Sequence, residues 1–373
     1  MEIFWFLFAY MLIIAFIFRG KSISDKKRMH ETICMCIPIF LILALRSPAC
    51  GIDLIHEEGS GNGYYTDFPI IAKSRWSEIF TSNYFHRNYE IGYLVYNKLV
   101  SYVSSNPQFF LAITALVSVG SIGYVIYKYS SNIFLSFLIY ICLGQYVFSF
   151  SALRQTMAIS LSLLGVRFLL ERKSWHYLFI LLLTLSFHTS SIVLFAAWPF
   201  CRKKLTNSTL IIMLLLVIAS IPALKILLSF VLSVIGFYSL SITEGSAVTM
   251  FFVYFALLAV SLIIKPDYKG NQDKEKTFSF YRWVILFAVF GQSLGFIDSG
   301  WLTRIGFYFS IYFCLFLPEL FYGIGKNFRS ILYPIIVVLF ILFFYLTTKD
   351  GYLDVVPYHF FWEYWNLDLY WTA

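Results

Sequence analysis

The stretch ILYPIIVVLFILFFYL, residues 331–346, contains no charged side chain. As an α-helix it extends about 24 Å at 1.5 Å per residue, and roughly 20 apolar residues cross the hydrocarbon core of a bilayer. Charged residues stand on both sides of the run, Lys326 and Arg329 before it and Lys349 and Asp350 after it. The stretch therefore predicts a helix that crosses a membrane.

Comparable runs recur along the whole chain. Hydrophobic residues make up 60% of the 373 and charged residues 13%, against about 45–50% and 25% in soluble domains. The runs are continuous rather than alternating, which favours helices over barrel strands. We therefore expect an all-α, polytopic transmembrane bundle of about 11–12 spans, forming a single integral membrane domain over residues 1–373. The predicted spans are 3–18, 32–45, 107–127, 133–150, 155–170, two short segments in 177–199, 208–222, 248–264, 278–296, 301–317 and 331–346.

The Lys and Arg residues between these spans indicate an orientation, because positive charge is retained on the cytoplasmic side. That side then carries Arg19 to Arg28, Lys128, Arg172 with Lys173, Arg202 to Lys204, Lys265 to Lys276, and Lys326 with Arg329. The assignment requires residues 175–200 to form a hairpin that turns near His188. A single tilted span there would instead place the Arg202 cluster outside. Under the hairpin interpretation both termini are extracytoplasmic.

The net charge of +8 is spread over these loops. It collects on no single face or tail, so it indicates membrane anchoring rather than nucleic-acid binding. The 6 cysteines are scattered and form no set with metal-ligand spacing. There is also no DxD pair of the kind that holds a metal against a nucleotide-sugar diphosphate. We expect neither a metal ion nor a soluble cofactor.

Residues 46–106 form a long segment without a predicted span. Connections this long are functional or disordered, and the aromatic residues Tyr64, Tyr65, Phe68 and Trp76 argue against disorder. We therefore expect a structured extracytoplasmic cap loop over 46–106. After Glu90, an amphipathic helix in the membrane interface is predicted by the spacing of Ile91, Leu94, Val95, Lys98, Leu99 and Tyr102.

Arg46, Arg154 and Arg304 lie at the outer ends of predicted spans, where positive charge is normally excluded. Guanidinium groups bind phosphate through two parallel hydrogen bonds. We expect the three to converge on a phosphate-bearing ligand. The alternative is that each binds a lipid headgroup or pairs with a nearby carboxylate. Arg167 and Arg282 lie near the cytoplasmic ends of their spans, reach water there, and are interpreted as structural.

Three residues on the predicted outer face are candidates for acid–base chemistry. Asp53, Glu90 and His188 could each accept a proton from a hydroxyl nucleophile. The sequence contains no Gly-x-Ser-x-Gly motif and no Ser-His-Asp arrangement. If a diphosphate leaves at this face, the arginines rather than Mg²⁺ must stabilise it.

Short motifs follow one another in a set order along nearly the whole chain. They are Leu45-Arg46-Ser47-Pro48 with Gly51-Ile52-Asp53, Tyr64-Tyr65, Glu90-Ile91-Gly92-Tyr93, Leu153-Arg154-Gln155, Phe187-His188-Thr189-Ser190, Arg304 with Tyr308, and Pro357-Tyr358. In this order and placement the chain resembles the EpsG family of Wzy-type polysaccharide polymerases. One departure is the segment 54–63, which separates Asp53 from Tyr64, whereas the family places aromatic residues close to its Asp. Asp67, within Tyr65-Thr66-Asp67-Phe68, therefore remains an alternative to Asp53.

The resemblance implies a GT-C-like, multi-pass glycosyltransferase of the bacterial inner membrane. Such an enzyme joins oligosaccharide repeat units carried on undecaprenyl diphosphate into O-antigen, capsule or exopolysaccharide at the outer membrane face, in some cases with a chain-length regulator protein. Its implied bases are Glu90, Asp53 or His188, and its implied diphosphate ligands are Arg46, Arg154 and Arg304. Substrate contacts of lower weight are Tyr65, Asp67, Tyr93, Gln155 and Tyr308. No cofactor is implied.

Other functions are weighed against this one. A flippase for lipid-linked oligosaccharides is expected to show inverted repeats and charges near the midplane of several helices, which we do not find. A membrane acyltransferase would take its donor from the cytoplasm, where the short loops offer only His30 and His176. A ligase that transfers finished polymer to lipid A uses similar chemistry and stays open. The sequence does not identify the sugars, the linkage or the stereochemical outcome.

Overall fold

The computed structural model describes residues 1–19, 24–55, 63–81, 89–171, 173–201, 203–235, 246–297 and 302–363. Within these ranges all regular secondary structure is helical, and a single β-bridge joins Arg46 to Phe360. The elements are α1 (Glu2–Ile17), α2 (Asp25–Ala44), α3 (Tyr64–Lys73), α4 (Trp76–Ile79), α5 (Ile91–Ser101), α6 (Pro107–Tyr129), α7 (Ile133–Cys142), α8 (Gln145–Phe148), α9 (Leu153–Leu164), α10 (Val166–Leu170), α11 (Ser174–Phe187), η1 (Thr189–Ile192), α12 (Val193–Cys201), α13 (Asn207–Ile235), α14 (Ser246–Ile263), α15 (Gln272–Ser293), η2 (Leu294–Phe296), α16 (Arg304–Ser310), α17 (Phe313–Tyr322), α18 (Lys326–Thr348), η3 (Tyr352–Asp354) and η4 (Phe361–Glu363). The predicted all-α class is confirmed.

Several of these helices have the length and composition of membrane spans. In the described part of the chain, three qualify on their own: α6, residues Asn207–Leu227 of α13, and α18. The bent pair α16 and α17 qualifies as a fourth if it is one span. The apolar parts of α1, α7, α11 and α14 are shorter. The protein is therefore a multi-pass membrane protein, while the larger number of crossings stays a prediction.

Two predicted spans are broken rather than straight. The segment 133–150 ends as a helix at Cys142 and turns at Gly144, whose φ of 85° is the left-handed conformation that favours glycine. The segment 301–317 divides into α16 and α17, which meet at 44°. These breaks place short helix ends inside the bundle, where backbone polar groups need protein partners.

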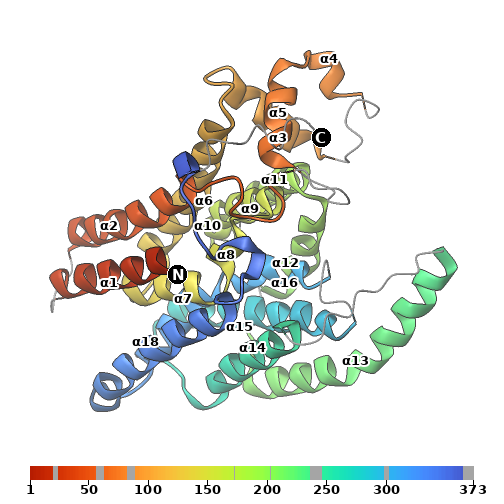
Figure 1. Cartoon of the computed structure of the whole chain (residues 1–373). Helices are drawn as coiled ribbons and strands as arrows, with labels where there is room; N and C mark the ends of the chain where they lie inside the picture. The colour runs from red at the N-terminus through yellow and green to blue at the C-terminus, as the bar shows by residue number, and fades with distance from the viewer. Residues whose placement is uncertain are drawn as a thin grey trace.

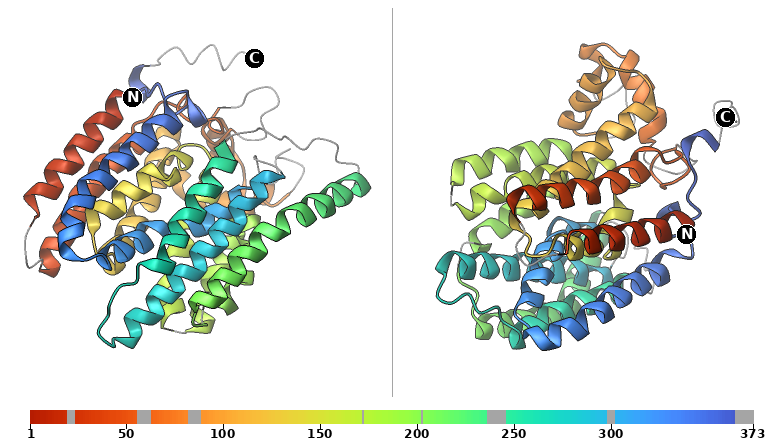
Figure 2. Two further views of the ribbon diagram at one scale, coloured as in Figure 1. Left: turned by 90° about the horizontal axis from the view of Figure 1, so that it is seen from below. Right: turned by 90° about the vertical axis from the view of Figure 1, so that its left-hand side faces the viewer.

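The long helices run side by side in the bundle (Figure 2, left). Close packing is clearest where α15 meets α16, because a Cβ atom on Gly291 would lie 2.6 Å from the Cα atom of Gly306. Aromatic stacking adds to the core, with the rings of Phe148 and Phe307 4.2 Å apart. The small residues thus allow α16, which begins at Arg304, to lie directly against α15.

Residues 174–201 reverse direction as predicted. Helix α11 ends at Phe187, His188 is extended, and η1 leads into α12. The ring of Tyr177, near the start of α11, lies 5.7 Å from that of Trp198, near the end of α12. The two legs therefore return side by side, and the turn lies at His188. The membrane face on which this turn lies remains a prediction.

The segment 46–106 forms α3, α4 and α5, which project from one side of the bundle (Figure 1; Figure 2, right). Among its described residues there is no helix of spanning length. The Nζ atom of Lys98 on α5 donates hydrogen bonds to the carbonyls of Ala72 (2.7 Å) and Ser74 (2.6 Å), at the end of α3. These bonds and buried aromatic contacts, such as the stack of Phe68 on Phe110 at 4.6 Å, hold the projecting helices to α6.

Candidate functional site

Four helices bring the candidate residues together. Glu90 is the N-cap of α5, and its extended backbone (φ −68°, ψ 146°) directs the side chain away from its own helix. Arg154 lies in the first turn of α9, and His188 forms the turn between α11 and η1. Helix α5 approaches α11 closely, because a Cβ atom on Gly92 would lie 2.7 Å from the carbonyl oxygen of Ser186. Only glycine at position 92 permits this approach of Glu90 to His188.

The Glu90 carboxylate is the centre of the cluster. Its Oε2 atom accepts a hydrogen bond from Nη1 of Arg154 at 2.6 Å, and its Oε1 atom lies 2.9 Å from Nδ1 of His188. The backbone N–H of Thr189 donates to Oε1 at 3.0 Å. Burial raises the pKa of Glu90, but the hydrogen bond from His188 and the charge of Arg154 outweigh burial and lower the pKa to about 2. Glu90 is therefore ionised at neutral pH and is a weak base.

The contact with Glu90 also determines what His188 can do. A carboxylate oxygen accepts hydrogen bonds only, so the proton of the neutral imidazole lies on Nδ1. The other ring nitrogen, Nε2, then carries a lone pair that can accept a proton. Two residues further along the turn, the hydroxyl of Ser190 lies 3.1 Å from that of the buried Tyr308. This arrangement orients His188 as a proton acceptor.

Aromatic residues hold Arg154 in place. Its Nε donates to the hydroxyl of Tyr64 at 3.2 Å, and its guanidinium carbon lies 4.9 Å from the ring centre of Tyr89. The Tyr89 hydroxyl in turn donates to Asp67 at 2.5 Å. Asp67 is buried, and its hydrogen bond with Tyr89 holds the ring on which Arg154 packs. The ring of Tyr93 packs edge-on against Tyr64 and Tyr89.

Asp53 and Arg304 complete the charged cluster in a different way. The Oδ2 atom of Asp53 is buried and has no hydrogen-bond partner, and no ion pair or hydrogen bond of the Arg304 side chain occurs within the described residues. Burial raises the pKa of Asp53, and the charges of Arg304 and Arg154 offset only part of that effect. The backbone carbonyl of Arg304 accepts a hydrogen bond from Nε2 of Gln155 at 2.6 Å, which fixes the start of α16 beside α9. Buried polar groups are rarely left unpaired. The Oδ2 atom of Asp53 and the guanidinium of Arg304 therefore have bonding capacity for a ligand.

Arg46 lies in a different environment from Arg154 and Arg304, the two arginines whose charges act on Asp53. The Arg46 side chain donates to the carbonyls of Leu43 and Phe150, lies 5.2 Å from the ring centre of Phe150, and is 1% exposed. The adjacent backbone is fixed by the C-terminal segment, since Ser47 N–H donates to the carbonyl of His359 at 2.8 Å. Arg46 thus holds the turn that precedes Arg154 and takes no direct part in the cluster.

The other predicted substrate contacts, Tyr65, Gln155 and Tyr308, lie around the cluster. Tyr65 is half-buried, and its N–H donates to the carbonyl of Leu54 at 2.9 Å, which together with Tyr64 fixes the backbone around Asp53. Gln155 and Tyr308 adjoin the cluster, as described above. Four residues of the cluster were not predicted as site residues: Tyr64, Tyr89, Thr189 and Ser190. Their positions beside Asp53, Glu90 and His188 in sequence or in the quoted motifs were the available signal.

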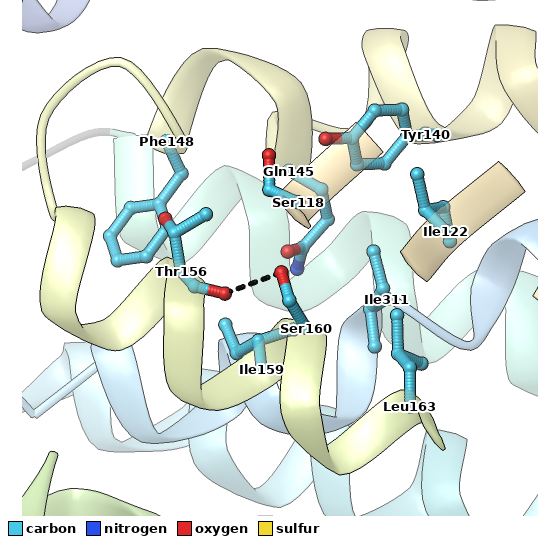
Figure 3. A pocket seen from close by; sticks show the side chains of 10 residues that line it. All are labelled: Ser118, Ile122, Tyr140, Gln145, Phe148, Thr156, Ile159, Ser160, Leu163 and Ile311. Carbon is cyan, nitrogen blue, oxygen red and sulfur yellow. Dashed lines mark hydrogen bonds between the residues drawn. The ribbon is translucent and has the colours of Figure 1, made fainter. Parts of the chain in front are cut away.

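A small cavity lies inside the bundle below the first turns of α9. It measures about 20 Å³ and is lined by polar side chains, such as Gln145 and Thr156, together with apolar ones, such as Ile122 and Leu163. Figure 3 shows the Ser160 hydroxyl bonded to the Thr156 carbonyl, at 2.7 Å. The volume suits about one water molecule, so the cavity is too small for a sugar. Within the described part of the chain, no group of three His, Cys, Asp or Glu side chains is placed to hold a metal ion.

Comparison with known proteins supplies one match. No curated protein and no solved structure matches the chain. The family model EpsG matches residues 32–360, a range that contains every residue of the cluster. The chain therefore belongs to the EpsG family, which is a family of Wzy-type polysaccharide polymerases.

Proposed function

We propose that this protein is a glycosyltransferase that polymerises oligosaccharide repeat units carried on undecaprenyl diphosphate, at the outer face of the bacterial cytoplasmic membrane. Membership of the EpsG family supports polysaccharide polymerisation. The observation that carries the proposal further is a single cluster of two arginines, a carboxylate-oriented histidine and an unpaired aspartate oxygen. These are the groups needed to hold a phosphate leaving group and to activate a hydroxyl.

Arg304 is the principal ligand for the departing diphosphate. Its guanidinium makes no hydrogen bond within the described residues, so its planar set of donors is available to phosphate oxygens. Arg154 is already bonded to Glu90 and Tyr64, and it contributes fixed positive charge at the same place. Such preorganised charge stabilises the negative charge that develops on the leaving oxygen.

His188 is the general base. In the proposed step, a hydroxyl oxygen of the incoming unit bonds to the anomeric carbon of the donor while the bond from that carbon to the phosphate oxygen breaks. The hydroxyl proton passes to Nε2 of His188, and the lipid diphosphate leaves as an anion. Glu90 remains ionised and stabilises the resulting imidazolium through Nδ1, as a carboxylate does in other histidine-based sites.

Asp53 has the role of orienting the sugar. Its buried, unpaired Oδ2 atom accepts a hydrogen bond from a sugar hydroxyl, which satisfies the oxygen and positions the substrate against Arg304. A site built to bond a hydroxyl discriminates strongly against substrates that lack it. Asp53 therefore contributes to specificity, in contrast to Asp67, which supports Arg154 through Tyr89.

Gel electrophoresis of surface polysaccharide from a deletion strain tests the proposal. Loss of the polymerase leaves a single repeat unit in place of a ladder. An unextended core would indicate a ligase instead, and absence of any exported unit would indicate a flippase; either result overturns the proposal.

Complementation with variants tests the assigned residues. Arg304→Lys keeps the charge and loses the planar donors, so we expect single units at normal protein level. His188→Gln removes the base and should reduce the rate by about 10²–10⁴-fold. Arg167→Lys is the matched control, because Arg167 is largely exposed and pairs with Glu171 on its own helix surface. Normal ladders from both site variants would contradict the mechanism and leave the family assignment intact.

A further inference from the structure

Helix α5 exposes apolar residues on its outer side and buries the polar Asn97 and Lys98, together with Tyr93, Leu94 and Val100, on its inner side. Ile91, Leu99 and Tyr102 at its surface are 56%, 55% and 67% exposed, whereas Asn97 and Lys98 are 0% and 7% exposed. The structure corrects part of the predicted stripe here, because Leu94 and Lys98 face inward. A helix packed on a protein and bathed in water instead carries polar residues on its outer side.

The inward amino group of Lys98 and the Nδ2 atom of Asn97 bond within the protein, whereas the Oδ1 atom of Asn97 is buried without a hydrogen-bond partner among the described residues. Lys98 caps the carbonyl end of α3, and Nδ2 of Asn97 donates to the carbonyl of Tyr93 at 2.7 Å. These bonds fix the orientation of α5. Rotating the helix about its axis would leave the charge of Lys98 and the carbonyl end of α3 without them. The apolar side is left facing outward as a consequence.

Helix α4 extends this surface. Trp76 donates from Nε1 to the hydroxyl of Tyr102 at 2.7 Å, and the ring of Phe80, which is 54% exposed, stacks on Trp76 at 6.2 Å. We define the cap apolar face as Trp76, Phe80, Ile91, Leu99, Tyr102 and Val103. Two exposed basic residues, Lys73 and Arg75, lie just before Trp76 in the chain.

We propose that the cap apolar face is embedded in the outer headgroup region of the phospholipid bilayer, with anionic headgroups at Lys73 and Arg75. Trp and Tyr prefer this depth, because their rings are apolar and their polar atoms reach water. Basic residues beside such a face are attracted to anionic lipids. The surface thus combines the two features that bind a membrane interface.

Continuity with the spanning helices favours lipid over a protein partner. Only residues 102–106 separate α5 from the span α6. On the other side α5 packs at Gly92 against α11, where Phe179 and Leu182 are 66% and 54% exposed apolar side chains. The cap apolar face is therefore flanked by helices that themselves contact lipid, and the bilayer that surrounds them covers it.

This placement sets the depth of the candidate site, although the proposal does not depend on the proposed function. Glu90 is the N-cap of α5, so a helix held at headgroup level holds the cluster of Glu90, Arg154 and His188 at that level too. The phosphates of any lipid-linked substrate lie at the same depth. The interfacial helix would thus bring the site to the substrate's phosphates without lifting the lipid from the membrane.

Depth-dependent quenching in nanodiscs of phosphatidylethanolamine and phosphatidylglycerol tests the proposal. The full-length variants Leu99→Cys and Tyr102→Cys carry an environment-sensitive fluorophore, and the unsubstituted chain, labelled in the same way, supplies the background from the native cysteines. Leu339→Cys on the exposed face of α18 is the lipid-contacting reference, and Asn271→Cys at the exposed polar N-cap of α15 is the aqueous reference. All four side chains are exposed, so each substitution leaves the buried core unchanged.

We expect the probes at 99 and 102 to resemble the one at 339 in being quenched at least about twofold more strongly by spin-labelled lipid than by aqueous iodide, but at a shallower depth, because an interfacial face lies about 5–10 Å deep. Probes that behave like the one at 271 would show a face open to water. Probes shielded from both quenchers would show a covering protein. Either of these results overturns the proposal.

Discussion

Replacing Glu90 by Gln removes the charge at the centre of the candidate site while preserving the size of the side chain. The folded protein lowers the pKa of Glu90 from 4.5 to about 2. One pH unit corresponds to about 1.4 kcal/mol, so the ionised carboxylate contributes about 3 kcal/mol to folding at neutral pH. Arg154 and Glu90 are 13% and 10% exposed, so solvent screens their interaction little.

The sign of the pH dependence follows from the direction of this shift. A lowered pKa gives stability that is fully present above the ordinary pKa of 4.5 and disappears as the pH falls from 4.5 to about 2. Glu90→Gln should therefore lower the free energy of unfolding by about 3 kcal/mol at pH 7, and the difference from the parent protein should vanish at the acid end of that window.

Unfolding followed by helical circular dichroism in detergent, at a series of pH values, measures this difference. Glu171→Gln is a matched control, because Arg167 and Glu171 also lie 2.6 Å apart but are 57% and 38% exposed. Solvent screens an exposed pair, so its contribution to stability is small, and the control should differ little from the parent protein. Equal losses from the two variants, or a Glu90→Gln loss that does not depend on pH, would refute the reasoning.

Three further predictions concern the supports of the site and its orientation. Gly92→Ala should destabilise the protein by about 1–3 kcal/mol and abolish polymer, because the new methyl group pushes α5 away from α11. A thermal melt measures the first effect and a polysaccharide gel the second, and an unchanged melt would contradict the close approach of the two helices. Arg46→Lys should reduce the amount of folded protein on an immunoblot, since Lys cannot donate to the Leu43 and Phe150 carbonyls at the same time. Arg304→Lys should instead lose polymer at a normal protein level. Reporter fusions should show residue 204 in the cytoplasm and residue 62 outside; a reporter at 204 found outside would reject the predicted topology.

Much of the fold could be predicted because it depends on local sequence. Uncharged runs such as 331–346 are long enough to form spanning helices whatever their neighbours, and α18 contains that run. The reversal at His188 followed from charge on both sides of a segment too short for two crossings. The breaks at Gly144 and between α16 and α17 could not be predicted in this way, because they depend on packing inside the bundle.

The candidate site was predictable in its components but not in its connections. The sequence placed Arg46, Arg154 and Arg304 at the same end of the bundle, but the direction of each side chain depends on distant residues. Arg46 bonds to the Phe150 carbonyl, 104 residues away, which removes it from the cluster. Likewise, the contact of Glu90 with His188 joins residues 98 apart. No local pattern distinguishes these partners from others on the same face.

The most direct test of the proposed activity uses purified full-length protein reconstituted with a defined oligosaccharide on undecaprenyl diphosphate. The proposal predicts products that increase by one repeat unit at a time, with one undecaprenyl diphosphate released for each unit joined. Arg304→Lys should give neither product under the same conditions. A reconstituted protein that binds this substrate but forms no longer product, or that extends it without releasing the lipid diphosphate, would contradict the proposal.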